Sequence, residues 1–226
     1  MRGISLEIYL IRHGKPISKN NHWIKPNTPL SLEGIEQAEK IASKLGKIQF
    51  NALITSPLIR AKQTAEIIKQ RSPISVFFQE KEWLAEIDLG DWAGSDKASI
   101  SKKYSNLNNQ VILGGYNNKG PLISRLLESN KEFCFPSGES LFSFWTRVND
   151  GLVKTLRQFR GQENKRIALV GHGGSFTIIM LTLLRYSFFD RNFPVFIFKM
   201  GDSTIIRIRN EQIQFLSMNS FYISND

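Results

Sequence analysis

Short apolar runs alternate with amphipathic segments along most of the chain. Runs that are typical of buried strands lie at residues 4–11, 52–56, 74–78 and 167–170. Segments with apolar residues at helical spacing lie between and after these runs, at residues 31–46, 57–68, 139–159 and 173 onwards. This alternation predicts an α/β fold, a three-layer sandwich in which helices cover both faces of a mostly parallel central sheet.

The starts of the first two helices carry recognisable signals. Ser31 is placed to cap the first helix, Leu30 and Ile35 to pack against each other across its start, and Gly46 to end it. Ser56 takes the capping position of the second helix. The buried face of the first helix is expected to consist of Ile35, Ala38, Ile41, Ala42 and Leu45.

The last third of the chain adds two further elements. The apolar stretch 176–189 is interrupted by Arg185, and its uncharged part is too short to span a bilayer, so a buried helix is the better interpretation. Alternating apolar and polar residues from Ser203 predict a hairpin that turns near Asn210 and Glu211.

Residues 95–137 differ from the rest of the chain because they are rich in Ser, Asn, Lys and Gly. Short helices are expected within them, one of them at residues 121–129. We interpret the segment as a helical and looped insertion over one edge of the sheet, a lid that sets specificity. The whole chain, residues 1–226, is then expected to form one domain.

The composition narrows the class of partner. The net charge is +10 and the pI about 9.8, which suits an anionic partner. The basic residues are spread without a dense block, which favours a small phosphorylated metabolite over a specific nucleic acid or a membrane. The single cysteine, Cys134, excludes an intrachain disulfide and, with no secretory signal apparent, favours a cytoplasmic location. A homodimer is compatible with these features.

Charged and imidazole side chains follow the predicted strands. Arg12 and His13 come directly after the first strand, Arg60 lies just past the second, and His172 ends the strand that begins near Ile167. Glu86 lies in the loop after the third strand. Because ligands bind beyond the carboxyl ends of parallel strands, we expect these groups to converge at one edge of the sheet.

The residue types at this edge suit a phosphate ester. The forks of Arg12 and Arg60 can each bind a phosphate bidentately. A neutral imidazole, on His13 or His172, is a good nucleophile toward phosphorus. Glycine follows each histidine and lets backbone approach a ligand closely.

A proton donor for the departing alkoxide is also needed. Glu86 is the candidate, and on composition alone it competes with Glu80, Glu82, Asp88 and Asp91. Zinc bound by the two histidines and a carboxylate is a second interpretation. The absence of an HExxH pair or a cysteine cluster disfavours it, and two nearby arginines would repel a dication. We therefore expect no metal and no cofactor.

Five segments of the chain, in order, match the motifs of one family. They are LIRHGKP, SPLIRAKQTA, LAEIDLGDWAG, PSGES and LVGHGG, and their spacing agrees from Ile8 to about Phe176. On these motifs the chain resembles the histidine phosphatase superfamily, the phosphoglycerate mutase-like proteins, in its branch of mutases and small-molecule phosphatases.

The resemblance implies a role for each site residue. His13 would be the nucleophile that forms a phosphohistidine, and Glu86 would protonate the leaving group and then activate water. Arg12, Arg60 and His172 would hold the phosphoryl oxygens, together with backbone at Gly14 and Gly173. The implied enzyme is a metal-independent phosphomonoesterase, a phosphoric monoester hydrolase of the histidine acid phosphatase type, acting on a small phosphorylated metabolite.

Three departures from the family pattern bear on the reaction. Lys15 stands where the family often has Glu or Gln, and KPISKNN replaces the stretch that follows RHG in mutases, which favours a phosphatase. Ala93 replaces the usual Glu of the GxWEG motif. The alternatives are a phosphoglycerate mutase-type phosphotransferase and a catalytically degenerate member that binds a phosphorylated ligand or polyanion. His22 and Trp23 are candidates for the pocket mouth.

Overall fold

The computed structural model describes residues 5–72, 76–103, 122–162, 164–210 and 212–217. In chain order the elements are β1 Ser5–Arg12, α1 Leu32–Leu45, β2 Ala52–Thr55, α2 Ile59–Gln70, β3 Phe77–Glu80, η1 Glu82–Leu84, η2 Gly90–Trp92, α3 Lys97–Lys103, α5 Leu122–Ser129, α6 Leu141–Gln158, β4 Lys165–Gly171, α7 Gly173–Leu183, β5 Ser203–Arg209 and β6 Gln212–Ser217.

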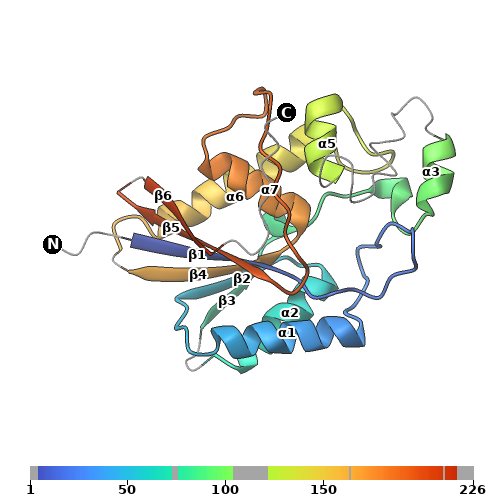
Figure 1. Cartoon of the computed structure of the whole chain (residues 1–226). Coiled ribbons are helices and arrows are strands. Elements are labelled where there is room, and N and C mark those ends of the chain that lie inside the picture. The colour runs from blue at the N-terminus through green and yellow to red at the C-terminus, as the bar shows by residue number, and fades with distance from the viewer. Residues whose placement is uncertain (1–4, 73–75, 104–121, 163, 211, 218–226) are drawn as a thin grey trace.

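The strands form one six-stranded sheet in the order β3-β2-β4-β1-β5-β6. The first four in that order are mutually parallel, whereas β5 and β6 form an antiparallel hairpin beside β1. Helices α1 and α2 lie on one face of the sheet, and α6 and α7 lie on the other (Figure 1). The predicted α/β fold with a mostly parallel sheet and the predicted closing hairpin are confirmed.

The sheet separates two apolar cores. Because successive side chains of a strand point to opposite faces, Ile8 and Leu10 of β1 pack with the cluster under α6 and α7, while Tyr9 and Ile11 pack with the cluster under α1 and α2. All four are buried. A strand buried on both faces explains why this segment reads as a continuous apolar run.

Helix α1 begins where the sequence predicts, but its buried face differs. The hydroxyl of Ser31 caps it by accepting a hydrogen bond from the Gly34 amide at 3.1 Å. Ile35 is 36% exposed, so its predicted place on the buried face is wrong. Gly34 faces inward instead, and a Cβ there would lie 2.0 Å from the carbonyl oxygen of Lys15. Backbone packing of the loop after β1 therefore takes the place of an apolar side chain.

Two predicted boundaries are wrong. Helix α2 begins at Ile59 with Leu58 as its capping residue, so Ser56 is not the cap and its hydroxyl is used elsewhere. Strand β3 begins at Phe77, because pairing with β2 sets its register as Ala52 opposite Phe77 and Thr55 opposite Glu80. Of the strand predicted at 74–78, residues 74 and 75 lie outside the described residues.

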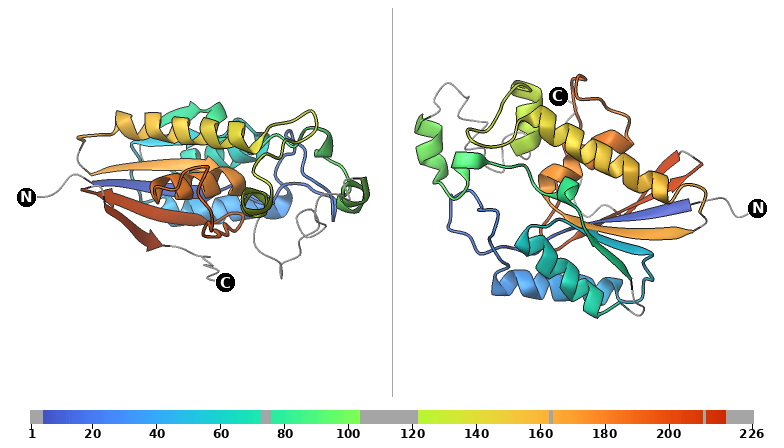
Figure 2. Two further views of the ribbon diagram at one scale, coloured as in Figure 1. Left: turned by 90° about the horizontal axis from the view of Figure 1, so that it is seen from above. Right: turned by 180° about the vertical axis from the view of Figure 1, so that it is seen from behind.

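The predicted insertion contains two described helices, α3 and α5, and α5 confirms the helix expected at 121–129. Both lie toward the end of the molecule opposite the N-terminus (Figure 2). Residues 104–121 lie outside the described part. Among the described residues, no helix is long and apolar enough to cross a membrane. The apolar segment that begins at Phe176 belongs to α7, a helix that is buried on most sides.

An ion-pair network links three neighbouring strands, β4, β1 and β5, near the amino end of β1. Glu7 is 9% exposed and lies between Arg166 of β4 and Arg207 of β5 in the strand register. Its carboxylate accepts from Arg166 Nε at 2.9 Å and Arg207 Nη2 at 2.7 Å. Burial raises the pKa of the Glu7 carboxyl, but the hydrogen bonds from Arg207 and Arg166 outweigh burial and hold the pKa below its usual 4.5.

Replacing Glu7 with Gln is expected to lower the free energy of unfolding at pH 7 by about 1–2 kcal/mol, because the charge-assisted hydrogen bonds from two partly exposed arginines are weakened or lost. A lowered pKa in the folded state means that the contribution of Glu7 is present above pH 4.5 and is lost as the pH falls through the folded-state value. Urea unfolding at pH 7 and at pH 3.5 measures both effects. The exposed Glu66→Gln on α2 is the control, and an equal Glu7→Gln deficit at both pH values would contradict this assignment.

Candidate active site

The carboxyl ends of the four parallel strands meet at one cavity of about 1420 Å³. Arg12 and His13 reach it from β1, and Arg60 reaches it from the first turn of α2. Glu86 reaches it from the loop between η1 and η2, and Gly173 from the start of α7. His172 is fully buried beside them, with its ring centroid 4.9 Å from that of His13. The structure thus brings together the groups that the sequence expects at this edge.

The His13 ring is held in one tautomer. Its Nδ1 lies 2.7 Å from the carbonyl oxygen of Gly14, which can only accept, so Nδ1 carries the proton. Nε2 therefore holds a lone pair, and Arg60 Nε donates to it at 3.2 Å. Burial, and then the charges of Arg12 and Arg60, hold the pKa of His13 well below 6.5. The imidazole is neutral at neutral pH, with Nε2 as its nucleophilic atom.

The two arginines are fixed by backbone carbonyls. Arg60 is buried, and its Nη1 donates to the carbonyl of Pro26 at 3.0 Å. Arg12 Nη1 donates to the carbonyl of Phe198 at 2.5 Å. Burial lowers the pKa of Arg60 to about 10, although the charge of Glu86 opposes this shift, so Arg60 stays protonated at neutral pH. Two preoriented cations beside His13 have the charge and geometry to bind an anion such as a phosphoryl group.

Ser56, which the sequence places as a helix cap, instead orients His172. The Ser56 hydroxyl lies 2.7 Å from His172 Nε2, and it also accepts from the Leu58 amide at 3.2 Å. Burial, followed by the charge of Arg60, lowers the pKa of His172 well below 6.5, so this imidazole is neutral too. Its Nδ1 has no hydrogen-bond partner among the described residues.

Glu86 is bound to the start of α7. Its Oε2 accepts from the Gly174 amide at 3.0 Å, and its Oε1 accepts from the Ile87 amide at 3.2 Å. A Cβ at Gly174 would lie 2.1 Å from Glu86 Oε1, so a larger residue at this position would displace the carboxylate. This contact distinguishes Glu86 from its acidic neighbours, and it joins residues 88 positions apart.

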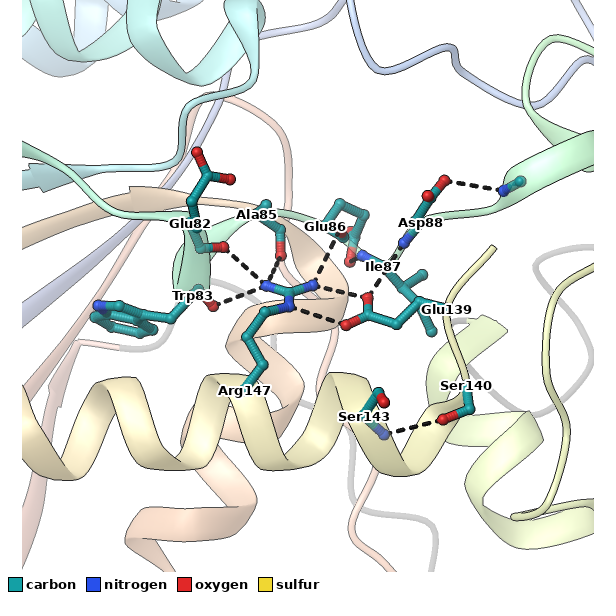
Figure 3. A network of polar contacts seen from close by, with 11 residues as sticks. Glu82, Trp83, Ala85, Glu86, Ile87, Asp88, Glu139, Ser140, Ser143 and Arg147 are labelled. Atoms are coloured by element: carbon teal, nitrogen blue, oxygen red, sulfur yellow. Dashed lines mark hydrogen bonds and ion pairs between the residues drawn. The ribbon is translucent and has the colours of Figure 1, made fainter. Parts of the chain in front are cut away.

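The loop that carries Glu86 is held by Arg147 of α6 (Figure 3). Arg147 Nη1 points at the backbone carbonyls of Glu82, Trp83 and Ala85, at 2.9, 3.1 and 3.2 Å. Its Nε and Nη2 form a bidentate pair with Glu139 at 2.9 and 2.8 Å. Arg147 was not among the predicted site residues, although it lies eight positions after the Glu of the PSGES motif.

Replacing Arg147 with Met is expected to lower kcat/KM for an alkyl phosphate by about 10–100-fold, because the loop loses its anchor and Glu86 is displaced. The inhibition constant of inorganic phosphate should change little, since Arg12 and Arg60 are not touched. Arg147→Lys should recover part of the loss, because one ammonium can still reach a carbonyl. The control is Arg157→Met at an exposed position of the same helix, and a matched rise in the phosphate constant would contradict this role.

Of the other residues singled out in the sequence, Gly14 packs against backbone, and Lys15, His22, Trp23 and Ala93 lie at the wall of the cavity. The Gly14 amide donates to Thr64 Oγ1 at 3.2 Å, and a Cβ at Gly14 would lie 2.2 Å from the Gly34 carbonyl oxygen, so this glycine permits close backbone packing. Lys15 pairs with Glu33 at 2.5 Å at an exposed edge of the cavity. His22, Trp23 and Ala93 line the cavity.

Among the described residues, there is no cluster of three or more His, Cys, Asp or Glu side chains that could hold a metal ion. The fold and the site together define an α/β protein with a cationic, histidine-containing pocket at the carboxyl edge of its sheet. The family model of the histidine phosphatase superfamily (branch 1) matches residues 8–220, and the chain belongs to that superfamily.

Curated relatives and solved structures include mutases and phosphatases. A probable phosphoglycerate mutase, GpmB, of Escherichia fergusonii is 25% identical over 181 residues, which cover 79% of this chain and 75% of the relative. A putative alpha-ribazole-5'-P phosphatase from Escherichia coli K-12 shares the fold with a TM-score of 0.72 at 22% identity, over 98% of this chain and 99% of that one. A mycobacterial glucosyl-3-phosphoglycerate phosphatase gives a TM-score of 0.74 at 20% identity, over 96% and 99%.

Proposed function

We propose that the protein is a metal-independent phosphomonoesterase that hydrolyses a small phosphorylated metabolite through a phosphohistidine on His13. The single observation that carries this proposal is the state of His13. A neutral, buried imidazole presents its Nε2 lone pair to Arg60 in the field of a second cation, Arg12, while its Nδ1 proton is fixed on a carbonyl oxygen. This arrangement suits a nucleophile for an anionic phosphorus centre.

In the first step, His13 Nε2 forms a bond to phosphorus and the bond from phosphorus to the ester oxygen breaks. The phosphoryl oxygens replace Nε2 as the acceptor of Arg60 and also bind Arg12 and His172, which stabilises the charge of the transition state. Glu86, protonated, delivers its proton to the departing oxygen, so the product leaves as an alcohol.

In the second step, water attacks the phosphohistidine and gives its proton to the Glu86 carboxylate. The bond between Nε2 and phosphorus breaks, and inorganic phosphate leaves with His13 restored as a neutral imidazole. The Gly174 amide and the Arg147 anchor keep Glu86 at the cavity throughout both steps.

The test is hydrolysis of p-nitrophenyl phosphate and of a broad panel of phosphate esters in the presence of a strong chelator. Release of inorganic phosphate that is unaffected by the chelator is the expected result. Inactivity of the wild-type protein on every ester would overturn the proposal. It would favour a member of the superfamily that binds a phosphorylated ligand without hydrolysing it, an alternative suggested by Ala93 at the position of the motif glutamate.

A mutase is the second candidate, because a relative of 25% identity is named a probable phosphoglycerate mutase. The phosphohistidine would then be attacked by a hydroxyl of the bound intermediate, which requires that water be excluded while that intermediate reorients. A coupled assay with and without a bisphosphate primer separates the two, and primer-dependent isomerisation faster than phosphate release would establish the mutase.

A further inference from the structure

The amino ends of the parallel strands form the end of the molecule opposite the cavity. A strand rises about 3.3 Å per residue, so Ser5 at the start of β1 lies roughly 23 Å from Arg12 at the cavity. Helices α1, α2 and α6 each precede a parallel strand, so they run back from the cavity side and end here, as does β5 (Figure 1). We define the amino face as the described residues of 5–7, 44–52, 69–77, 157–166 and 207–212.

Most of the excess positive charge of the chain falls in these five ranges. They contain ten basic residues and three acidic ones, so they account for +7 of the net charge of +10. The ten are Lys44, Lys47, Lys69, Arg71, Arg157, Arg160, Lys165, Arg166, Arg207 and Arg209. They are dispersed along the sequence, which therefore shows no basic block, and it is the fold that brings them to one end of the sheet.

The carboxylate that the structure describes on this face is already paired. Glu7 binds Arg166 and Arg207, and the other two acidic residues of the ranges, Glu163 and Glu211, lie outside the described part. Within the described part, the remaining eight cations form no ion pair with a carboxylate. The amino face therefore carries a concentrated, largely uncompensated positive charge, which attracts an anionic surface.

Helix dipoles account for only part of this charge. Lys44, Lys69 and Arg157 lie in the last turns of their helices, where the dipole stabilises a cation. Lys165 and Arg209 lie on strands, where no helix dipole acts on them. The strand cations extend the positive surface across the sheet, beyond what stabilisation of the helix ends requires.

The cations of the amino face are spread in two dimensions. They come from α1 and α2 on one side of the sheet, from the end of α6 on the other, and from β4 and β5 between them. Six strands about 4.8 Å apart make the sheet roughly 24 Å wide. A nucleic-acid strand is bound along a groove of cations, whereas a broad array matches the plane of anionic lipid headgroups.

An exposed aromatic side chain lies on the same face. Phe77 is the first residue of β3, opposite Ala52 at the start of β2, and it is 61% exposed. Beside it, Lys69 Nζ lies 5.0 Å from the centre of the Phe78 ring. Aromatic residues next to cations are typical of protein surfaces that rest in the interface of a bilayer.

We propose that the amino face binds the surface of a membrane that contains anionic phospholipids. The arginine and lysine side chains donate to lipid phosphates, and the Phe77 ring enters the headgroup layer. The cavity then faces away from the membrane and stays open to water. This inference goes beyond the proposed function and does not depend on it.

Cosedimentation with vesicles tests the inference without turnover. The wild-type protein should bind vesicles of phosphatidylcholine with 30% phosphatidylglycerol at least about tenfold more tightly than vesicles of phosphatidylcholine alone. Raising the salt from 0.1 to 0.5 M should remove most of that binding, because the charges are exposed and screened. Equal binding to the two kinds of vesicle would overturn the inference.

Two double variants locate the binding surface. Lys47→Gln with Arg71→Gln, and Arg160→Gln with Arg209→Gln, remove exposed charges from opposite parts of the amino face. Each pair should weaken binding to the anionic vesicles by about 10–30-fold, since each basic residue near such a surface contributes about fivefold. Thermal unfolding checks that each variant is folded.

The matched control is Lys19→Gln with Lys102→Gln, which removes the same net charge from exposed positions at the cavity end. Its vesicle binding should stay within about threefold of the wild type. If the control weakened binding as much as the two face variants, the attraction would depend on net charge alone and the assignment to the amino face would be wrong.

The single cysteine of the chain reports the orientation. Cys134 is exposed and lines the cavity, so a maleimide should label it equally fast with and without anionic vesicles. In a Cys134→Ser background, Gln49→Cys places a thiol at an exposed position of the amino face, and vesicles should slow its labelling several-fold. Protection of Cys134 instead would show that the cavity end faces the membrane, and would overturn the inference.

A nucleic acid is the rival occupant. Fluorescence anisotropy with a labelled 20-base-pair RNA measures it directly. RNA binding that both face variants weaken, with no binding to the anionic vesicles, would overturn the membrane assignment and make the amino face a nucleic-acid surface. None of these results bears on hydrolysis of p-nitrophenyl phosphate, so the inference and the proposed function can fail separately.

Discussion

Replacing His13 with Asn is expected to lower kcat for every phosphate ester by at least about 10⁴-fold. The asparagine amide can keep a hydrogen bond to backbone, but it has no nitrogen lone pair that can attack phosphorus. Arg12, Arg60 and Glu86 stay in place, so weak binding of inorganic phosphate should persist. Loss of rate with retained binding is the signature of a missing nucleophile rather than of a collapsed site.

The covalent intermediate gives a direct measurement. Rapid quenching of the wild-type protein with a ³²P-labelled ester should yield labelled protein whose label is labile to acid and stable to base. Peptide analysis should place the label on His13, and His13→Asn should carry none. His22→Asn is the control, because His22 is the one histidine of the chain that lies outside the buried pair. A label on His172 or His22 in the wild-type protein would contradict the assignment of His13.

Much of this site could be predicted because several of its residues lie in short sequence motifs at the ends of predicted strands. RHG and GHGG mark the carboxyl ends of two predicted strands, and parallel strands have their carboxyl ends at the same edge of the sheet, so the two motifs are expected to meet. The structure agrees, because β1 and β4 are neighbours and Arg12 pairs with Gly171 in their register. The choice of Glu86 among five acidic residues needed the family resemblance. In the structure, Glu86 differs from the other four by its contact with the Gly174 amide, and a partner 88 residues away cannot be identified from the local sequence.

The parts that escaped prediction depend on partners that are distant in sequence. Ser56 has the residue type and position of a helix cap, but its hydroxyl is taken by His172, 116 residues away. Arg147 looks like any polar residue of an amphipathic helix until η1 packs against α6 and turns its carbonyls toward the guanidinium. This close packing is possible because Gly151 of α6 has no side chain: a Cβ there would lie 2.0 Å from the Trp83 ring. Strand β3 was misplaced for the same reason, since its register is set by β2 and not by its own apolar residues.

Replacing Glu86 with Gln is expected to lower kcat/KM for an alkyl phosphate by about 10²–10⁴-fold. A glutamine can still accept from the Gly174 amide through its oxygen, so the geometry is retained while the proton donor is lost. p-Nitrophenol is a good leaving group that needs little proton assistance, so formation of the phosphohistidine from p-nitrophenyl phosphate should be almost unaffected. The two substrates therefore separate proton donation from positioning.

The same substitution also removes the base that activates water, so the second step should become rate-limiting for Glu86→Gln with p-nitrophenyl phosphate. Stopped-flow measurement should show a burst of p-nitrophenolate close to the enzyme concentration, followed by slow turnover, together with accumulation of the phosphohistidine. The control is Glu82→Gln in η1, just before this loop; its side chain is exposed, and the substitution should leave both steps unchanged. An equal loss for the alkyl and aryl esters without a burst would mean that Glu86 organises the start of α7 and transfers no proton, because a purely structural defect cannot depend on the basicity of the leaving group.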